Sequence, residues 1–168
     1  MSDHPHPTPA VAISGLGKRY GAIKAVDGLS MTVPDGGVHG FLGPNGSGKT
    51  TTIRMLLGLI PADAGTMRLF GEPVPARLPQ VIDKVGAIVE QPKFFDTFSA
   101  RKNLALLAQA IGAPLSRVAE VIEQVGLTGR ERGDFRTYSL GMKQRLAVAA
   151  TLLKDPQLLI FDEPTNGL

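Results

Sequence analysis

The stretch that decides the fold is FLGPNGSGKT, residues 41–50, in which an apolar start runs into a glycine-rich turn that ends in lysine and threonine. Gly43, Gly48, Lys49 and Thr50 fit the pattern G-x-x-x-x-G-K-[ST], called the phosphate loop below. Its glycines let successive backbone N–H groups point at one anion, and a following helix would present its positive end there. Lys49 adds charge for the outer phosphates, and the Thr50 hydroxyl can bind Mg²⁺.

The segments on either side favour this interpretation over a chance match in a glycine-rich turn. GVHGFLG, residues 37–43, is expected to be a strand, and KTTTIRMLLGLI, residues 49–60, a helix ended by Pro61. The predicted nucleotide contacts cover the whole turn and the first helical residues: Gly43, Pro44, Asn45, Gly46, Ser47, Gly48, Lys49, Thr50 and Thr51.

Length and composition describe an ordinary globular chain. The 168 residues are 43% hydrophobic and 20% charged, which fits one folded core. Without cysteine, disulfides, thiolate zinc sites and cysteine nucleophiles are excluded. A net charge of +3 without a dense basic block argues against a nucleic-acid partner. No run approaches the roughly 20 apolar residues that cross a bilayer, so we expect a cytosolic protein whose membrane association goes through a partner or a surface contact.

The chain divides into recognisable segments. Residues 1–10 are expected to be a flexible leader, in which His4 and His6 are solvated rather than metal ligands, and residues 11–34 a strand-rich lobe. Further expectations are a hairpin at GTMRLFGEPV (65–74), a strand at KVGAIVEQ (84–91), helices at RKNLALLAQAIG (101–112), PLSRVAEVIEQVGL (114–127) and GMKQRLAVAATLLKD (141–155), and a buried strand at QLLIFDEP (157–164).

Two carboxylates follow the last predicted strand. Ligands of open α/β sheets bind at the carboxyl ends of the strands, where Asp162 and Glu163 emerge. Asp162 would hold the metal through water, and Glu163 would orient or deprotonate an attacking water. A solvated strand end is the alternative for this pair, and the phosphate loop argues against it. We therefore expect Lys49 and Asp162 to act on one magnesium-bound triphosphate.

Three further signals narrow the class. Gln91 ends the strand GAIVEQ, YSLGMKQR precedes the third helix, and DEPTNGL follows the carboxylates. In this order, from about residue 13 to residue 168, the chain closely resembles the ATP-binding subunit of ATP-binding-cassette (ABC) transporters. The resemblance implies an α/β, RecA-like P-loop NTPase core in a domain of residues 11–168. It also implies an N-terminal antiparallel β lobe, an inserted helical subdomain at residues 92–138, and ATP and Mg²⁺ as cofactors.

The resemblance also assigns roles to single residues. Tyr20 matches the aromatic that stacks on adenine, although a surface or core tyrosine is the alternative. Gln91 matches the glutamine that reaches the metal and the attacking water. Ser139 and Gly141 match the signature that caps the nucleotide of the opposite subunit, although Ser139 could be only a helix cap. Leu140 and Met142 replace the commonest signature residues, and this YSLGM form is similar to that of exporters of drugs and antimicrobial peptides.

The resemblance implies a head-to-tail dimer of two ATP-binding subunits and a membrane-spanning permease partner. The chain would then lie at the inner face of the cell membrane. Phe94, Phe95 and Phe98 are candidates for the docking surface, with packing between the two lobes as the alternative. A soluble ABC-type ATPase acting on ribosomes or DNA is the competing function. It is disfavoured because long heptad repeats and a second cassette are missing, and a GTPase is disfavoured because no N-K-x-D motif is present.

The chain ends at Leu168, before the aspartate and histidine that the family carries further on. His39 lies in the predicted strand before the phosphate loop, is expected to be buried or packed there, and cannot replace that histidine. We therefore expect an ABC domain that is incomplete at its C-terminus, binds ATP weakly and turns over little.

Overall fold

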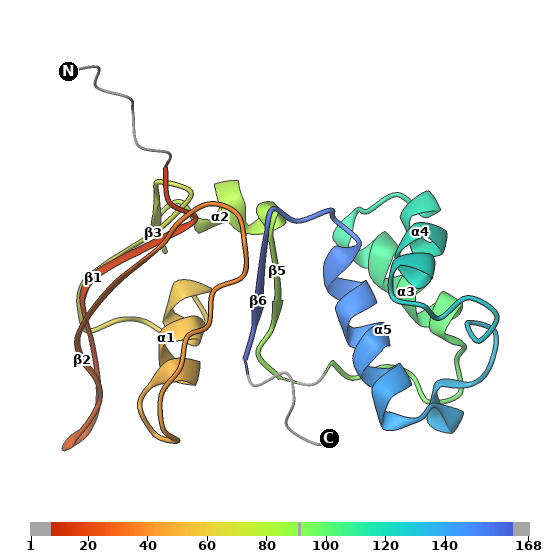
Figure 1. Ribbon diagram of the computed structural model, residues 1–168, viewed down its shortest axis with the longest axis horizontal. Helices are drawn as coiled ribbons and strands as arrows, with labels where there is room; N and C mark the ends of the chain where they lie inside the picture. The colour runs from red at the N-terminus through yellow and green to blue at the C-terminus, as the bar shows by residue number, and fades with distance from the viewer. Residues whose placement is uncertain (1–7, 91, 163–168) are drawn as a thin grey trace. The chain divides into compact units, whose positions relative to one another are not determined.

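The computed structural model describes residues 8–90 and 92–162, which divide into two compact units between Asp83 and Lys84 (Figure 1). Gln91 and Glu163, two of the predicted site residues, lie outside the described residues. The first unit carries the phosphate loop, and the second carries Ser139, Gly141 and Asp162.

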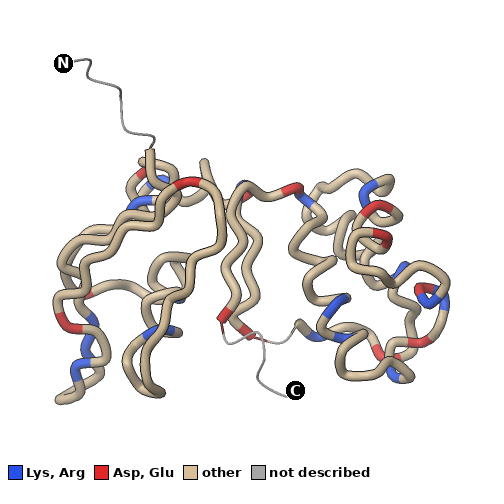
Figure 2. Tube along the Cα trace, viewed as in Figure 1, with Lys and Arg blue, Asp and Glu red and all other residues tan. Residues whose placement is uncertain are grey.

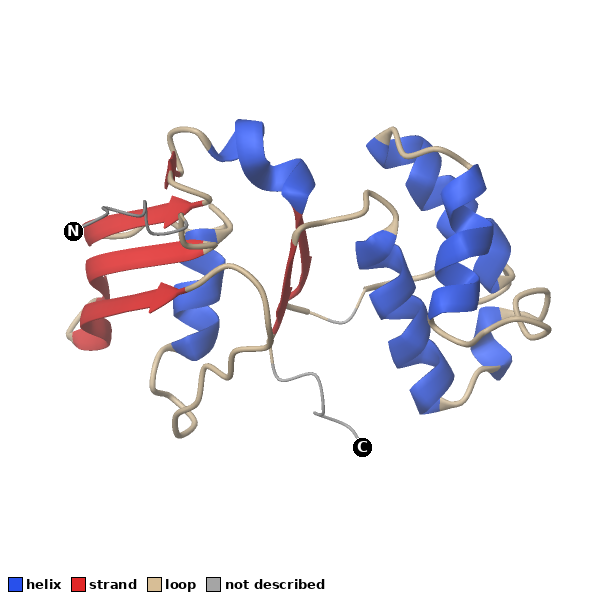
Figure 3. Cartoon of the chain, turned by 45° about the horizontal axis from the view of Figure 1, so that its top comes forward, coloured by secondary structure: helices blue, strands red, loops and turns tan. Residues whose placement is uncertain are grey.

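The first unit is built on a four-stranded antiparallel sheet with the strand order β2-β1-β3-β4 (Figure 3). Its strands are β1 (Val11–Tyr20), β2 (Ile23–Val33), β3 (Ala64–Leu69) and β4 (Glu72–Val74). The hairpin expected at residues 65–74 is confirmed by the pairing of β3 with β4. Strands β1 and β2 contain Gly15, Gly17 and Gly28, and they still pair almost throughout, up to Tyr20 opposite Ile23. Shifts of register absorb the glycines, because a bulge lets the ladder continue past them.

Helix α1 (Lys49–Leu56) packs against β2 and β3 and closes the core of this unit (Figure 1). The apolar face expected from the helical spacing is confirmed, because Ile53, Leu56 and Leu57 are all buried. The short helix α2 (Leu78–Val81) and the 3-10 helix η1 (Ile82–Lys84) end the unit. The core joins both layers through Ala10, Val11, Ile13, Leu16, Val26, Ile53, Met55, Leu56, Leu57, Met67, Leu69, Val74 and Val81.

The prediction of a strand at residues 37–43 is wrong. None of these residues belongs to a strand, and Val38 and Leu42 are about fully exposed, at 101% and 90%. An apolar run forms a strand only where another strand satisfies its backbone N–H and C=O groups, and no described strand pairs with this run. His39 is exposed rather than buried, with Nε2 at 2.8 Å from the Gly36 carbonyl oxygen.

The second unit contains a parallel pair of strands, β5 (Val85–Ile88) and β6 (Leu158–Phe161), in the register Val85 opposite Leu158. Both strands were expected from their apolar runs. Helix α5 (Leu140–Leu152) packs on β5 so closely that a Cβ on Gly86 would lie 2.9 Å from the Thr151 carbonyl oxygen. Complete burial of β6 was expected and is wrong, because Leu159 is 41% exposed.

A helical bundle makes up the rest of this unit: α3 (Ala100–Ile111), α4 (Ser116–Gln124), the 3-10 helix η2 (Phe135–Thr137) and α5 (Leu140–Leu152). Gly112 ends α3 in the left-handed conformation expected of a helix stop. Leu115 lies within the predicted helical range but precedes α4 as its N-cap residue, and it is 54% exposed. The core draws on all these elements: Ala100, Leu104, Ala108, Val118, Val121, Ile122, Leu127, Phe135, Tyr138, Leu146, Ala149 and Leu153.

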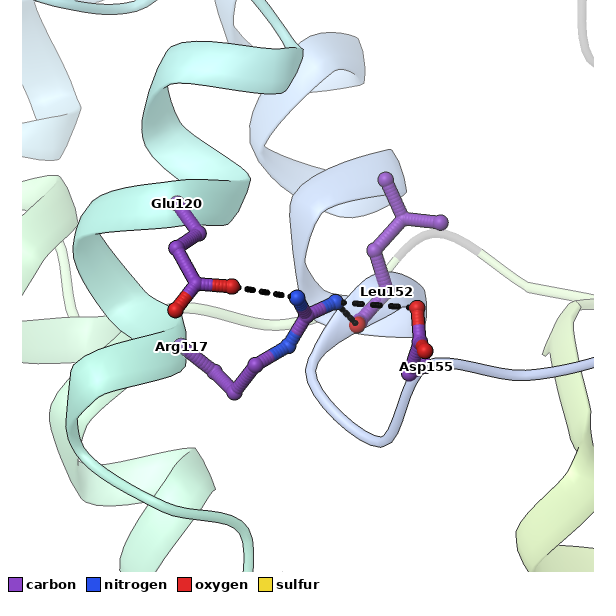
Figure 4. A network of polar contacts seen from close by, with 4 residues as sticks. All are labelled: Arg117, Glu120, Leu152 and Asp155. Carbon is purple, nitrogen blue, oxygen red and sulfur yellow. Dashed lines mark hydrogen bonds and ion pairs between the residues drawn. The ribbon is translucent and has the colours of Figure 1, made fainter.

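Arg117 ties α4 to the C-terminal end of α5 (Figure 4). Its Nη2 donates to the Leu152 carbonyl oxygen at 3.0 Å and to Asp155 Oδ1 at 3.2 Å, while Nη1 pairs with Glu120. The last carbonyls of a helix have no intrahelical partner and carry partial negative charge, so a guanidinium there satisfies them and complements the helix dipole. Arg117 thus fixes the turn through which the chain passes from α5 toward β6.

Candidate functional site

The phosphate loop is a tight turn whose backbone requires glycine. The Ser47 N–H donates to the Pro44 carbonyl oxygen at 3.1 Å, and Gly46 and Gly48 take φ angles of 81° and 89°. Residues other than glycine rarely adopt this left-handed backbone conformation. A Cβ on Gly48 would also overlap the Ala25 carbonyl oxygen and lie 2.8 Å from Val26 Cγ2. Gly48 therefore serves both the turn and the close approach of the loop to β2.

Helix α1 begins directly behind this turn with its first N–H groups available. Gly48 is the N-cap and offers no side-chain hydrogen bond, and the first turn contains no acidic residue. The first intrahelical bond runs from the Thr52 N–H to the Gly48 carbonyl oxygen at 2.8 Å, so the preceding N–H groups have no helical acceptor. Such a helix start attracts an anion through these donors and through the helix dipole.

The Lys49 ammonium spans the exposed turn. Its Nζ donates to the carbonyl oxygens of Gly43 at 2.8 Å and Pro44 at 3.1 Å. The lysine therefore lies across the same loop whose backbone turns toward the start of α1. A phosphate bound in the loop would take over this donor, because a charged acceptor forms the stronger hydrogen bond.

Tyr20 ends β1 and is 52% exposed, so it is not a core tyrosine. The Lys18 ammonium lies 5.6 Å from the ring centroid, within the range of a cation–π contact. An exposed ring of this kind can accept a planar partner, which the predicted adenine contact requires.

Asp162 follows β6 directly and extends its ladder. The Asp162 N–H donates to the Ile88 carbonyl oxygen at 2.9 Å, so the carboxyl ends of β5 and β6 lie side by side. Figure 2 shows acidic residues, in red, at these strand ends. Residues 8–90 and 92–162 contain no cluster of three or more histidines and carboxylates that would hold a metal alone. A metal bound by Asp162 would therefore need further ligands, such as phosphate oxygens.

Ser139 is the N-cap of α5, and its hydroxyl accepts a hydrogen bond from the Met142 N–H at 3.3 Å. Tyr138 anchors the cap, because its buried hydroxyl donates to the Arg130 carbonyl oxygen at 2.7 Å, and burial raises the pKa of this phenol. A Cβ on Gly141 would meet nothing within 4 Å, so packing inside the described chain does not require glycine there. The open start of α5 can therefore receive an external group.

The three phenylalanines play different parts. Phe94 packs edge-on against Phe135 at 5.1 Å between centroids, in the helical core. Phe95 is 62% exposed and contacts Phe98 at 5.0 Å. Sequence reasoning missed Asn103, which is 4% exposed and bonds both the N–H and the carbonyl oxygen of Phe95 at 2.8 and 3.1 Å. An amide directly before the apolar run of α3 was the available signal.

A sequence profile described as ABC transporter matches residues 26–166. The chain belongs to the ABC transporter family. Within it, the chain is 46% identical over 159 residues to the bacitracin transport ATP-binding protein BcrA of Bacillus licheniformis, covering 94% of this chain and 52% of that protein. It is 41% identical over 165 residues to the Nod factor export ATP-binding protein I of Ralstonia nicotianae, covering 96% and 51%. The chain thus spans about half the length of these curated relatives.

A solved ABC structure, cbiO1 from Clostridium perfringens, which is part of the ABC transporter complex cbiONQ, shares the fold with a TM-score of 0.84 at 24% identity. The alignment covers 96% of this chain and 68% of that one. The expected ABC fold is therefore confirmed, with its antiparallel β lobe and helices. Among the described residues, no helix is long and apolar enough to cross a membrane.

Proposed function

We propose that the chain is the nucleotide-binding part of an ABC transporter ATPase, which binds and hydrolyses MgATP to drive transport. The observation that carries this proposal is the phosphate loop: a glycine-enforced turn, the uncapped start of α1 and the Lys49 ammonium converge on one exposed point. Backbone donors, a helix dipole and a lysine ammonium together suit the β- and γ-phosphates of a nucleotide.

Catalysis in this proposal divides between named side chains. Lys49 neutralises the outer phosphates, while Thr50, Asp162 and Gln91 hold the metal, with Asp162 acting through water. Bound Mg²⁺ would supply charge neutralisation at the phosphate oxygens. Glu163 orients or deprotonates the attacking water, a role that typically contributes about 10²–10⁴-fold in rate. Tyr20 stacks on adenine, which adds about 1–3 kcal/mol of affinity.

A second ATP-binding subunit completes the site in a head-to-tail dimer. Ser139 and Gly141 would cap the nucleotide held by the opposite subunit. The support is local: the hydroxyl of Ser139 and the start of α5 are exposed, and Gly141 leaves space that internal packing does not use. A helix start facing the γ-phosphate would stabilise the bound state, so ATP would hold the dimer together.

The membrane partner is a permease subunit, which would hold the chain at the inner face of the cell membrane. Phe95 is the best-placed docking residue, because Asn103 fixes its backbone while its ring remains exposed. The names of the relatives, bacitracin transport and Nod factor export, favour transport, in the export direction, over a role on ribosomes or DNA. No nucleic-acid partner is proposed.

On its own, the 168-residue chain is proposed to bind ATP weakly and to turn it over slowly. Residues 37–43 lead into the phosphate loop without a partner among the described strands, and Val38 and Leu42 are exposed. A loop entered through an unpaired segment is held less firmly, and positioning supplies most of the catalysis in phosphoryl transfer.

A titration with a fluorescent ATP analogue, competed by unlabelled ATP, tests the proposed binding, and phosphate release tests turnover. We expect saturable Mg²⁺-dependent binding that Lys49→Ala weakens about 10- to 100-fold and a trace of turnover that Glu163→Gln removes. Glu123→Gln, an exposed residue on α4, is the matched control and should change neither. An unchanged ATP affinity of Lys49→Ala would contradict the proposed site, and rapid turnover by the isolated chain would contradict the predicted slow turnover.

A further inference from the structure

Asp63, in the loop between α1 and β3, clamps the end of β1. Its Oδ1 accepts from Lys18 Nζ at 2.9 Å, and its Oδ2 accepts from the Arg19 N–H at 2.7 Å. The Asp63 N–H in turn donates to the Gly17 carbonyl oxygen at 2.9 Å. One residue thus holds three successive residues of β1, and the clamp ends immediately before Tyr20.

Lys18 is held unusually firmly for a lysine. The residue is 8% exposed, and lysines are almost never so buried unless they are paired. Its Nζ lies both 2.9 Å from Asp63 and 5.6 Å from the centroid of the Tyr20 ring. The backbone N–H of Arg19 and then the Lys18 ammonium keep the pKa of the Asp63 carboxyl below its ordinary value, so this carboxylate stays charged at neutral pH.

The clamp contacts Tyr20, the side chain at this strand end that is proposed to bind adenine. Tyr20 sits at the turn of an exposed hairpin, where a side chain has rotamer freedom to lose on binding. A cation held against one face of the ring restricts that freedom and leaves the opposite face for a planar partner. Preorganisation of this kind raises affinity by reducing the cost of ordering.

We propose that Asp63, acting through Lys18, is a positioning residue for the nucleobase: it orients Tyr20 and so sets the base-dependent part of ATP affinity. This inference rests on the proposed function. Loss of the Asp63–Lys18 contact should weaken binding of the base without changing binding of the phosphates. A purely structural ion pair would not discriminate between these two parts of ATP.

The experiment compares two ligands, ATP and inorganic tripolyphosphate, by calorimetric or competition titration of the full 168-residue chain. Asp63→Asn keeps an acceptor for the Arg19 N–H but releases Lys18. We expect ATP to bind about threefold to tenfold more weakly, as partial loss of base stacking implies, and tripolyphosphate to bind unchanged. Lys18→Met, which keeps the apolar stem, should reproduce this selective loss.

Asp27→Asn is the matched control, because Asp27 on β2 pairs with Lys24 at 2.8 Å in the same hairpin and is 67% exposed. It should change neither affinity. In a Tyr20→Ala background, Asp63→Asn should have no further effect on ATP. Equal losses for both ligands, or no loss in either Asp63→Asn or Lys18→Met, would overturn the inference and leave the proposed function standing. Failure of the unchanged chain to bind either ligand would overturn both.

Discussion

The Nζ of Lys49 donates to the carbonyl oxygen of Gly43 at 2.8 Å, so the ammonium near the end of the phosphate loop bonds to the first residue of the same loop. A second bond, to Pro44 at 3.1 Å, holds the ammonium over the turn. The loop therefore keeps its lysine near the place where phosphate is proposed to bind. Binding exchanges two neutral acceptors for charged ones, which strengthens the hydrogen bonds of the ammonium.

Removal of this ammonium is expected to weaken ATP binding strongly. Hydrogen bonds to charged groups contribute about 1.5–3 kcal/mol, so Lys49→Ala should raise the Kd for ATP by about 10- to 100-fold. Lys24→Ala is the control, because Lys24 lies in the same unit and its side chain is 51% exposed. Equal affinities of the Lys49 variant and the unchanged chain, measured by titration, would show that the loop binds no phosphate.

Ser139 has a structural role that can be separated from its proposed role toward phosphate. Ser139→Ala removes the acceptor for the Met142 N–H and should cost about 1 kcal/mol of unfolding free energy. Ser139→Asp keeps a good cap, so its stability in urea should match that of the unchanged chain.

The same two variants address the dimer. Sedimentation of the Glu163→Gln variant in the presence of ATP and Mg²⁺ should detect ATP-dependent association. Ser139→Asp should suppress this association despite its intact cap, because a carboxylate repels the γ-phosphate. If Ser139→Asp associates as well as serine does, the hydroxyl is only a helix cap.

Arg117 is expected to stabilise the second unit. Arg117→Ala would leave the Leu152 carbonyl and Asp155 without this donor, and the loss of charged hydrogen bonds should cost about 1.5–3 kcal/mol. Amide hydrogen exchange should quicken first in the last turn of α5. Arg136→Ala is the control, since its side chain is 65% exposed and its pairing with Asp134 should contribute little. If Arg136→Ala lowers the free energy of unfolding as much as Arg117→Ala does, the proposed stabilisation by the link between α4 and α5 is contradicted.

Asp63 should make the stability of the first unit depend on acidity. Its pKa is lowered in the folded chain by the Arg19 N–H and the Lys18 ammonium, so the folded state favours the charged carboxylate. The resulting stabilisation is complete above the ordinary aspartate pKa of about 3.9 and disappears as the pH falls through the lowered value. Urea unfolding of the unchanged chain and of Asp63→Asn should therefore differ at neutral pH and converge in acid. A difference that grows as the pH falls would have the opposite sign and contradict this assignment.

The elements with strong local signals were predictable from the sequence. The phosphate loop followed from its glycine and lysine pattern, α3 and α5 followed from their apolar runs, and Ser139 was recognised as the cap of α5. Residues 37–43 were not, because an apolar run becomes a strand only with partners, which local sequence does not encode. The clamp of Asp63 on Lys18 was also beyond sequence reasoning, since its members are 45 residues apart and join only when β1 pairs with β3.

The central claim is that the phosphate loop and Asp162 bind one metal–nucleotide complex. Replacing Mg²⁺ by paramagnetic Mn²⁺ in the presence of ATP and recording amide relaxation tests it most directly. We expect the amide signals of Gly48 and Lys49 and that of Asp162 to broaden together, and Lys49→Ala to abolish the broadening at all three. Broadening confined to the phosphate loop, with the Asp162 amide unaffected at saturating ATP, would contradict the account.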